Sequence, residues 1–247
     1  MNALSRVRHQ WTTLGERDPF WAILSDSDKK DGGWDQAAFF QTGVDEINNV
    51  LRTAQSLSSI HFGSALDFGC GVGRLSQALA GHFERVIGVD IAPSMIRTAV
   101  ELNQFPDRCE YIHNVAADLS VLPDQCADFI YSCITLQHVV PALARSYIRE
   151  FFRIARPGAL VIFQLPCRPR SRVWHAIKGV APVWISNLLW RIRTGSPEAM
   201  ETYCIAQRKV IHQVQESGGE ILCVEDNQNG PPGWQSRKYF CRRCELA

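Results

Sequence analysis

The sequence lacks an apolar run long enough to cross a bilayer. An apolar stretch falls within residues 166–200, but it is short and interrupted by Pro182. The N-terminus also lacks the apolar segment and the small-residue cleavage site of a secretory signal peptide. From these absences we expect a cytoplasmic protein whose nine cysteines, scattered through predicted strands, are reduced thiols.

A metal-binding motif and a repeated unit are also missing. Cys241 and Cys244 form a lone C-x-x-C pair, with no second pair and no histidine at ligand spacing, so we interpret them as strand-end cysteines and expect no bound metal. No internal repeat or low-complexity tract occurs. With 247 residues and 46% apolar composition, the chain can bury a full core and suits one α/β domain with additions.

Net charge is only +1, but the two signs are unevenly placed along the chain. Acidic side chains outnumber basic ones over residues 1–136, and the reverse holds over residues 137–247. A basic half can bind nucleic acid, an anionic small molecule or a membrane surface, and it can equally be a solvated face without a partner. Charge alone leaves these alternatives open.

The most informative stretch of the sequence is residues 65–90. A short apolar run that contains Asp67 ends in Gly69, Gly71 and Gly73, which alternate with other residues. This pattern predicts a strand that ends in a glycine turn, where positive φ angles are allowed and a ligand can approach the main chain. We expect a helix to begin at Arg74, with its first amide groups directed at the turn.

A second apolar run, over residues 85–89, is rich in β-branched side chains and ends at Asp90. In doubly wound sheets, an acidic residue at the end of this strand binds the diol of a ribose. The glycine turn and Asp90 together therefore predict a βαβ unit that binds a nucleotide-like cofactor.

Three motifs, in this order, resemble those of the class I S-adenosylmethionine-dependent methyltransferases. The first is the string LDFGCGVGRL followed by Asp90, whose alternate glycines differ from the G-x-G-x-x-G dinucleotide spacing. The second is Ala117, Asp118 and Leu119, and the third is the expected fourth strand, which starts at Asp128. The resemblance covers roughly residues 64–165.

The resemblance implies a fold class and a cofactor. It implies a doubly wound α/β fold with a mostly parallel seven-stranded sheet, an antiparallel last strand, an N-terminal helical extension and a helical insert after the fifth strand. It also implies S-adenosylmethionine as methyl donor, S-adenosylhomocysteine as product, and no metal. The residues expected at the cofactor are Asp67, which orders the turn, Gly69, Gly71 and Gly73, Asp90 and Ile91 at the ribose, Asp118 and Leu119 at the adenine, and Ile134.

Helical patterns precede this core. Apolar residues recur every three to four positions over residues 4–14 and 39–51, which predicts two amphipathic helices. Residues 18–34 between them are expected to form a loop anchored by Phe20, Trp21 and Ile23. We divide the chain into an N-terminal helical cap, residues 1–60, and a methyltransferase domain, residues 61–247, whose insert at about residues 166–200 would cover the acceptor.

His138 is the candidate for a direct role in the reaction. Methyl transfer is an in-line displacement in which positioning supplies most of the rate. For an oxygen acceptor, His138 could act as a general base, since its unperturbed pKa lies near neutrality; the alternative is a histidine that fixes a loop by hydrogen bonding. We expect O-methylation of a small molecule or a glycan, including a lipid-linked sugar.

Aromatic and basic side chains are the expected acceptor contacts. Trp34 and Phe39 would cap the mouth of the site, Arg191 and Arg193 would pair with a phosphate, and Trp234 offers a flat face. The alternative is that the aromatic residues belong to the core and the arginines are solvated. Peripheral membrane contact through residues 166–200 is a further hypothesis.

Other functions stay open at this point. A nicotinamide-dependent oxidoreductase would also use the glycine turn and Asp90. A catalytically silent S-adenosylmethionine-binding protein is the other alternative, because cofactor residues do not prove a productive acceptor site. Nucleic acid is a less expected partner, since the sequence has no Asn/Asp-Pro-Pro-aromatic signature.

Overall fold

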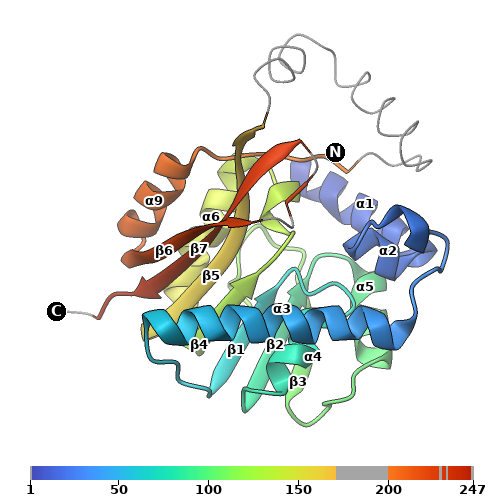
Figure 1. The fold of residues 1–247 in the computed structure, drawn as a ribbon, viewed down its shortest axis with the longest axis horizontal. Coiled ribbons are helices and arrows are strands. Elements are labelled where there is room, and N and C mark those ends of the chain that lie inside the picture. Colours follow the sequence, from blue (N-terminus) through green and yellow to red (C-terminus); the bar gives the residue numbers. More distant parts are fainter. Residues whose placement is uncertain (1, 171–199, 228–229, 232, 246–247) are drawn as a thin grey trace.

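A seven-stranded sheet forms the centre of the molecule (Figure 1). The computed structural model describes residues 2–170, 200–227, 230–231 and 233–245. The strands lie in the order β3-β2-β1-β4-β5-β7-β6. Their bounds are β1 Ser64–Phe68, β2 Arg85–Asp90, β3 Cys109–His113, β4 Ala127–Ser132, β5 Ala155–Pro169, β6 Gly219–Asn227 and β7 Trp234–Arg243.

The pairing of the strands confirms the expected fold class. Neighbours from β3 to β5 pair in parallel, whereas β7 runs antiparallel to both β5 and β6. The order reverses between β1 and β4, so the connections that follow these two neighbouring strands lead to opposite ends of the sheet and frame a crevice at their carboxyl ends, the place where open α/β sheets bind ligands.

Helices cover both faces of the sheet. They are α1 Ala3–Arg17, α2 Pro19–Ile23, α3 Gln36–Leu57, α4 Arg74–Ala80, α5 Pro93–Glu101, α6 Pro141–Ile154 and α9 Gln207–Glu216, with the short 3-10 turns η1 Ser27–Lys29 and η2 Leu136–His138. None of the helices in the described ranges is long and apolar enough to cross a membrane.

Alternation along the central strands separates two cores. Leu66 on β1 and Ile130 on β4 pack in one cluster with apolar residues of α6 and α9. Ala65 and Phe129, each one residue away, pack in a second cluster with α3 and α4. Successive side chains of a strand point to opposite faces, so a strand buried on both faces, as β4 is, places apolar residues on both; Phe129, Ile130 and Tyr131 follow one another in its middle.

A close crossing joins the N-terminal helix α3 to α4. A Cβ atom on Gly43 of α3 would collide with the main-chain oxygen of Arg74, the first residue of α4. Gly43 therefore lets the two helices approach, one of the reasons a glycine is tolerated inside a helix.

Two expectations about element boundaries are wrong. The stretch between the first two long helices is not a loop throughout, because Pro19–Ile23 forms α2, with Asp18 Oδ1 accepting a hydrogen bond from the main-chain N–H of Trp21 at 3.3 Å. The insert expected at about residues 166–200 also begins too early, because the fifth strand runs from Ala155, which pairs with Ala127, to Pro169, which pairs with Trp234. Residues 166–169 therefore belong to β5 rather than to a helical insert; residues 171–199 lie outside the described residues.

Candidate functional site

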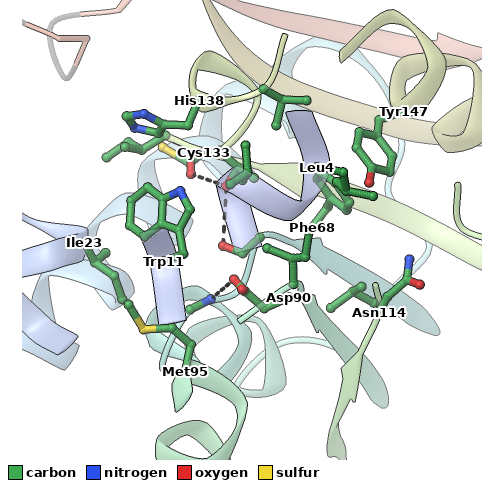
Figure 2. Close-up of a pocket in the computed structure, with 18 residues that line it drawn as sticks. Leu4, Trp11, Ile23, Phe68, Asp90, Met95, Asn114, Cys133, His138 and Tyr147 are labelled. Atoms are coloured by element: carbon green, nitrogen blue, oxygen red, sulfur yellow. Dashed lines mark hydrogen bonds between the residues drawn. The ribbon is translucent and has the colours of Figure 1, made fainter. Parts of the chain in front are cut away.

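A cavity lies at the carboxyl edge of β1, β2 and β4, and it encloses roughly 770 Å³ including its mouth (Figure 2). Helices α1 and α2 form its cover. The described residues that line it are Leu4, Val7, Trp11, Ile23, Phe68, Gly69, Gly71, Val89, Asp90, Ile91, Met95, Asn114, Cys133, Ile134, Thr135, His138, Val139 and Tyr147.

The glycine turn forms the floor of the cavity next to β1. Gly69, Gly71 and Gly73 have φ angles of +78°, +53° and +83°, a region that side chains other than glycine rarely adopt. The main-chain N–H of Gly69 donates to the carbonyl oxygen of Val89 at 2.8 Å, which ties the turn to β2. The alternating glycines thus fold as a left-handed turn whose main chain is open to a ligand.

Asp90 links the end of β2 to this turn. Its Oδ2 accepts a hydrogen bond from the main-chain N–H of Gly71 at 2.9 Å, and its Oδ1 accepts one from the N–H of Ala92 at 2.8 Å. Burial raises the pKa of the Asp90 carboxyl, and the two amide donors oppose that rise. The carboxylate is therefore held in one orientation at the cavity wall by main-chain groups alone.

Asp67 lies beneath the turn with its side chain buried. Ser76 Oγ donates to its Oδ2 at 2.6 Å, whereas its buried Oδ1 accepts no hydrogen bond from the described residues. Burial raises the pKa of Asp67 to about 6; the charge of Asp90 contributes to this rise, and the Ser76 hydrogen bond and the Arg74 guanidinium oppose it. Asp67 and Asp90 are therefore within electrostatic reach of each other, and Arg74 offsets part of their negative charge.

Few other charged groups line the cavity. Asp90 is the one Asp, Glu, Lys or Arg among the described lining residues, and the remaining polar side chains are neutral amide, hydroxyl, thiol and imidazole groups. Burial lowers the pKa of His138 to about 4, so its imidazole is neutral at physiological pH. The cavity therefore favours a cationic ligand at its Asp90 end and an apolar one elsewhere.

Ile134 follows β4 in a strained conformation. Its φ angle is +60°, which is unusual for a β-branched residue and costs about 1–3 kcal/mol. Gln164 Oε1 accepts the main-chain N–H of Ile134 at 2.8 Å. This turn brings Thr135 next to the glycine turn: Thr135 Oγ1 donates to the Cys133 carbonyl oxygen at 3.1 Å and lies 3.4 Å from the Gly69 carbonyl oxygen.

His138 is buried at the opposite wall, with both ring nitrogens in hydrogen bonds. Nδ1 lies 2.9 Å from the carbonyl oxygen of Glu201 and Nε2 lies 3.0 Å from Gln137 Nε2. Since a carbonyl oxygen can only accept, Nδ1 carries the proton and Nε2 accepts from the Gln137 amide. Trp11 of α1 packs edge-on against the imidazole, with 5.1 Å between ring centroids (Figure 2).

Comparison with known proteins identifies the domain. A family model described as "Methyltransferase domain" matches residues 66–163, from β1 into β5, which includes the glycine turn, Asp90 and the end of β4. Residues 66–163 carry a methyltransferase domain. The recognition made from LDFGCGVGRL and the two later motifs is confirmed.

The match to curated relatives of this methyltransferase domain covers only part of the length of those relatives. Malonyl-[acyl-carrier protein] O-methyltransferase of Serratia marcescens is 29% identical over 180 residues, which are 70% of this chain and 65% of that protein. Ubiquinone biosynthesis O-methyltransferase of Coxiella burnetii is 30% identical over 156 residues, 62% of each chain. The chain thus spans about two thirds or less of these relatives.

Solved structures share the fold of this methyltransferase domain along nearly the whole chain. The magnesium protoporphyrin IX methyltransferase from Synechocystis PCC 6803, with bound SAH, has a TM-score of 0.64 and 20% identity, and the match covers 98% of this chain and all of that one. A SAM-dependent methyltransferase from Leishmania major has a TM-score of 0.64 at 14% identity, over 97% of this chain and 83% of that one. At such identities the likeness shows the fold.

The structure brings most of the predicted cofactor residues together. Gly69, Gly71, Asp90, Ile91 and Ile134 line the cavity of the methyltransferase domain, while Asp67 and Gly73 lie directly behind the turn.

Asp118 and Leu119 are not among the lining residues. The exposed Asp118 carboxylate accepts from Ser120 Oγ at 2.8 Å, which lowers its pKa, and the Leu119 N–H donates to Glu150 Oε2 at 3.0 Å. Asn114 lines the cavity instead, and its Nδ2 donates to the Asp118 carbonyl oxygen at 2.7 Å. Its place directly after β3, at the carboxyl edge, is the sequence signal for this residue.

The predicted acceptor residues lie elsewhere in the described chain. Phe39 is fully buried and stacks on Phe20 with 4.5 Å between ring centroids, and Trp34 packs edge-on against Phe39. Trp234 begins β7 opposite Pro169. None of these three residues lines the cavity, and Phe39 belongs to the core, the alternative that the sequence left open. Arg191 and Arg193 fall outside the described residues.

The apolar stripe of α1, rather than those predicted acceptor residues, lines the cavity. Leu4, Val7 and Trp11 recur at helical spacing and face the cavity, joined by Ile23 of α2 (Figure 2). The stripe was visible in the sequence as an amphipathic pattern, but the pattern alone does not say which surface the stripe covers.

Proposed function

We propose that this protein transfers a methyl group from S-adenosylmethionine to an oxygen atom of a small molecule with an apolar body. The observation that carries the proposal is the pairing of a main-chain glycine turn with two carboxylates: Asp90, which is half-buried in the lining of an otherwise neutral and largely apolar cavity, and Asp67, which is buried behind the turn. The family match over residues 66–163 supports the same reaction.

The charge of the cavity separates the candidate cofactors. S-adenosylmethionine carries a cationic sulfonium and an ammonium group, which the negative potential of Asp67 and Asp90 favours. A nicotinamide dinucleotide carries an anionic pyrophosphate, and no described lining residue is a lysine or arginine that would neutralise it. Asp67 Oδ1 is buried and accepts no hydrogen bond from the described residues, which is consistent with a bound cationic ligand that interacts with this carboxylate. These features support the methyl donor over the oxidoreductase alternative.

The walls of the cavity define the acceptor class. Leu4, Val7 and Trp11 on α1 face Val139 and Tyr147, so most of the surface beyond the glycine turn is aliphatic or aromatic. A planar or aliphatic acceptor would bury apolar surface against such walls, and this burial favours binding. The relatives named as O-methyltransferases for malonyl-[acyl-carrier protein] and for ubiquinone biosynthesis support oxygen as the methylated atom.

Bound S-adenosylmethionine would supply an electrophilic methyl group on sulfur. The protein then has to hold the acceptor oxygen in line with that group and to keep water out. Asp90 and the main chain of Gly69 and Ile134 would hold the cofactor, while α1 closes the cavity over the acceptor. The role of His138 as a general base is not needed for an acceptor that is already ionised, such as a carboxylate.

Binding measurements test the proposal directly. We expect S-adenosylmethionine and S-adenosylhomocysteine to raise the melting temperature of the protein and NAD to leave it unchanged, because only a ligand of the folded state shifts the equilibrium. Equal or larger stabilisation by NAD would overturn the assignment. Incubation with methyl-labelled S-adenosylmethionine and a panel of carboxylic and phenolic acceptors then tests turnover.

A matched pair of carboxylate variants tests the cofactor position. Asp90→Ala is expected to weaken S-adenosylhomocysteine binding by roughly 1–3 kcal/mol, since the loss removes a placed acceptor and frees Gly71. Asp118→Ala removes an exposed carboxylate outside the cavity lining and should change the affinity less than about twofold. Calorimetric titration of both variants decides; a larger loss with Asp118→Ala would return that residue to the adenine site.

Three finer predictions remain part of the proposal. A glycan or lipid-linked sugar as acceptor, and membrane contact through residues 166–200, depend on Arg191, Arg193 and neighbours outside the described residues. A nucleic-acid acceptor has little support. Enzymes that methylate the carbon of cytosine use the cysteine of a Pro-Cys pair as nucleophile, and Pro166 and Cys167 form such a pair. Cys167 Sγ, however, donates to the Gln235 carbonyl oxygen and does not line the cavity. A cytoplasmic location stays a prediction from sequence.

A further inference from the structure

A chain of buried amides crosses from the middle of the sheet to both walls of the cavity. Gln164 on β5 has 1% of its surface exposed, and Gln137 in η2 has 3%. Gln164 Oε1 accepts the Ile134 N–H at 2.8 Å, and Gln164 Nε2 donates to Gln137 Oε1 at 3.1 Å and to Ser236 Oγ at 2.6 Å. Gln137 Nε2 then meets His138 Nε2 at 3.0 Å. We call these four residues, Ile134, Gln164, Gln137 and His138, the amide relay.

Main-chain groups at the two ends set the direction of every hydrogen bond in the relay. The Ile134 N–H can only donate, so the Gln164 oxygen must face it and the Gln164 amide nitrogen must face Gln137. Because the Gln137 oxygen accepts from Gln164, the Gln137 amide nitrogen faces His138 and donates an N–H to Nε2. At the far end the Glu201 carbonyl oxygen can only accept, which requires the proton on Nδ1. The two ends agree on one arrangement.

Each end of the relay has a consequence in the cavity. At one end, Gln164 holds Ile134 at a φ of +60°, and the next residue, Thr135, packs against Gly69 so closely that a Cβ on Gly69 would collide with it. At the other end, the Nε2 lone pair of His138 is occupied by an amide donor, so the ring presents its edge and face to the cavity rather than a basic nitrogen.

Packing alone does not explain a glutamine at this position. The flanking residues of β5, Phe163 and Leu165, are buried and apolar, and burying a side-chain amide has a cost that its hydrogen bonds merely offset. An apolar residue would serve the core as well. The hydrogen bonds of Gln164, however, join three separate parts of the chain: the turn after β4, η2 and β7.

We propose that Gln164 is a positioning residue for both halves of the site, holding Ile134 against the cofactor turn and, through Gln137, fixing His138 as a neutral Nδ1–H tautomer that forms part of the acceptor wall. His138 then acts as a wall and an anchor rather than as a general base. The cofactor half of this inference rests on the proposed function, whereas the His138 half does not.

Nitrogen NMR of histidine-labelled protein tests the His138 half without any ligand. The signal, identified by its loss in His138→Phe, should show a neutral imidazole protonated at Nδ1 near neutral pH. Gln164→Glu reverses the relay, because a carboxylate draws the Gln137 amide nitrogen and turns the Gln137 oxygen toward His138 Nε2. We expect Nε2 to become protonated in this variant while the Glu201 carbonyl oxygen keeps the proton on Nδ1, so that the ring becomes an imidazolium whose charge the new carboxylate balances. A merely structural glutamine would leave the tautomer unchanged.

A second variant covers the case in which a buried glutamate prevents folding. Gln137→Met removes the donor to Nε2 while Glu201 still accepts from Nδ1, so the Nε2 signal should move to that of a free lone pair. Ser236→Ala, which removes only the side branch from Gln164, should leave the His138 spectrum unchanged. Protonated Nε2 in the wild-type protein, or an unchanged signal in Gln137→Met, would overturn the His138 half.

Calorimetric titration with S-adenosylhomocysteine tests the cofactor half. Gln164→Met strands the Ile134 N–H and releases the strained turn, and we expect about a tenfold weaker affinity. Gln137→Met and Ser236→Ala keep the Ile134 hydrogen bond and should stay within about twofold of wild type. Equal affinities in a folded Gln164→Met would overturn this half. Wild-type protein that binds no S-adenosylhomocysteine would refute the proposed function instead, and the NMR result would still decide the role of Gln164.

Discussion

The two ends of the cavity that we assign to the cofactor and to the acceptor are built in different ways. Apart from Ile134, the cofactor end comes from one short stretch, residues 65–92, in which the Gly69 N–H donates to the Val89 carbonyl oxygen and the N–H groups of Gly71 and Ala92 donate to the Asp90 carboxylate. The acceptor end is assembled from α1, η2 and the segment at Glu201 by side-chain contacts such as Trp11 with His138. Local geometry governs the first, and tertiary packing governs the second.

This difference predicts which substitutions each end tolerates. A main-chain turn with positive φ angles cannot accept a Cβ without strain, whichever side chain carries it. A wall of apolar side chains can lose one member and still surround the remaining space, because the cost depends on how far the neighbours relax. We therefore expect larger effects at the cofactor end.

The largest effect is expected for Gly69→Ala. Its φ of +78° disfavours any side chain, and the new Cβ would collide with Thr135, so we predict a loss of roughly 2–4 kcal/mol in the free energy of unfolding and loss of S-adenosylhomocysteine binding. Gly158→Ala is the matched control, since Gly158 has a similar φ of +79° but open space around its Cβ position. Chemical denaturation compares the two; equal losses would show that φ alone, and not the contact with Thr135, causes the effect.

Asp67→Asn should reveal a conflict between stability and cofactor binding. With a folded pKa of about 6, above its ordinary value of 3.8, Asp67 contributes stability that is full below about pH 4 and is lost as the pH rises through 6. At pH 7 the charged form costs up to about 3 kcal/mol, so the variant should unfold at higher temperature there and should match wild type near pH 4.

The same variant should bind S-adenosylmethionine less tightly, because one of the two negative charges at the cofactor end is lost. Melting curves between pH 4 and 8, with and without ligand, measure both effects. A variant that is less stable than wild type at pH 7 would mean that the hydrogen bond from Ser76 to the Asp67 carboxylate stabilises the fold by more than the burial of that charge destabilises it.

Trp11→Ala should have the smallest effect on the cofactor end. The side chain is partly buried between α1 and His138, so its removal is expected to lower the free energy of unfolding by about 2 kcal/mol and to loosen the acceptor wall. Binding of S-adenosylhomocysteine should weaken less than about threefold. If calorimetry instead shows a loss as large as that of Asp90→Ala, α1 belongs to the cofactor end, and the contrast between the two ends does not hold.

Sequence by itself determined the glycine turn, the acid beside it and the fold class. Gly69, Gly71, Gly73 and Asp90 lie within 22 residues, and their chemistry depends on backbone geometry that neighbouring residues set, so a linear pattern was sufficient to predict a turn and an acid beside it. The antiparallel last strand followed from the same family pattern.

Tertiary structure alone decided the acceptor end. Trp34 and Phe39 have the composition of a binding surface, yet they pack with Phe20 in a core, and it is α1 that faces the cavity. His138 has an ordinary pattern in the sequence, but its tautomer depends on Gln164, 26 residues away, and on Glu201, 63 residues away. Burial and hydrogen-bond partners are properties of residues brought together across the chain, and periodicity along the chain cannot contain them.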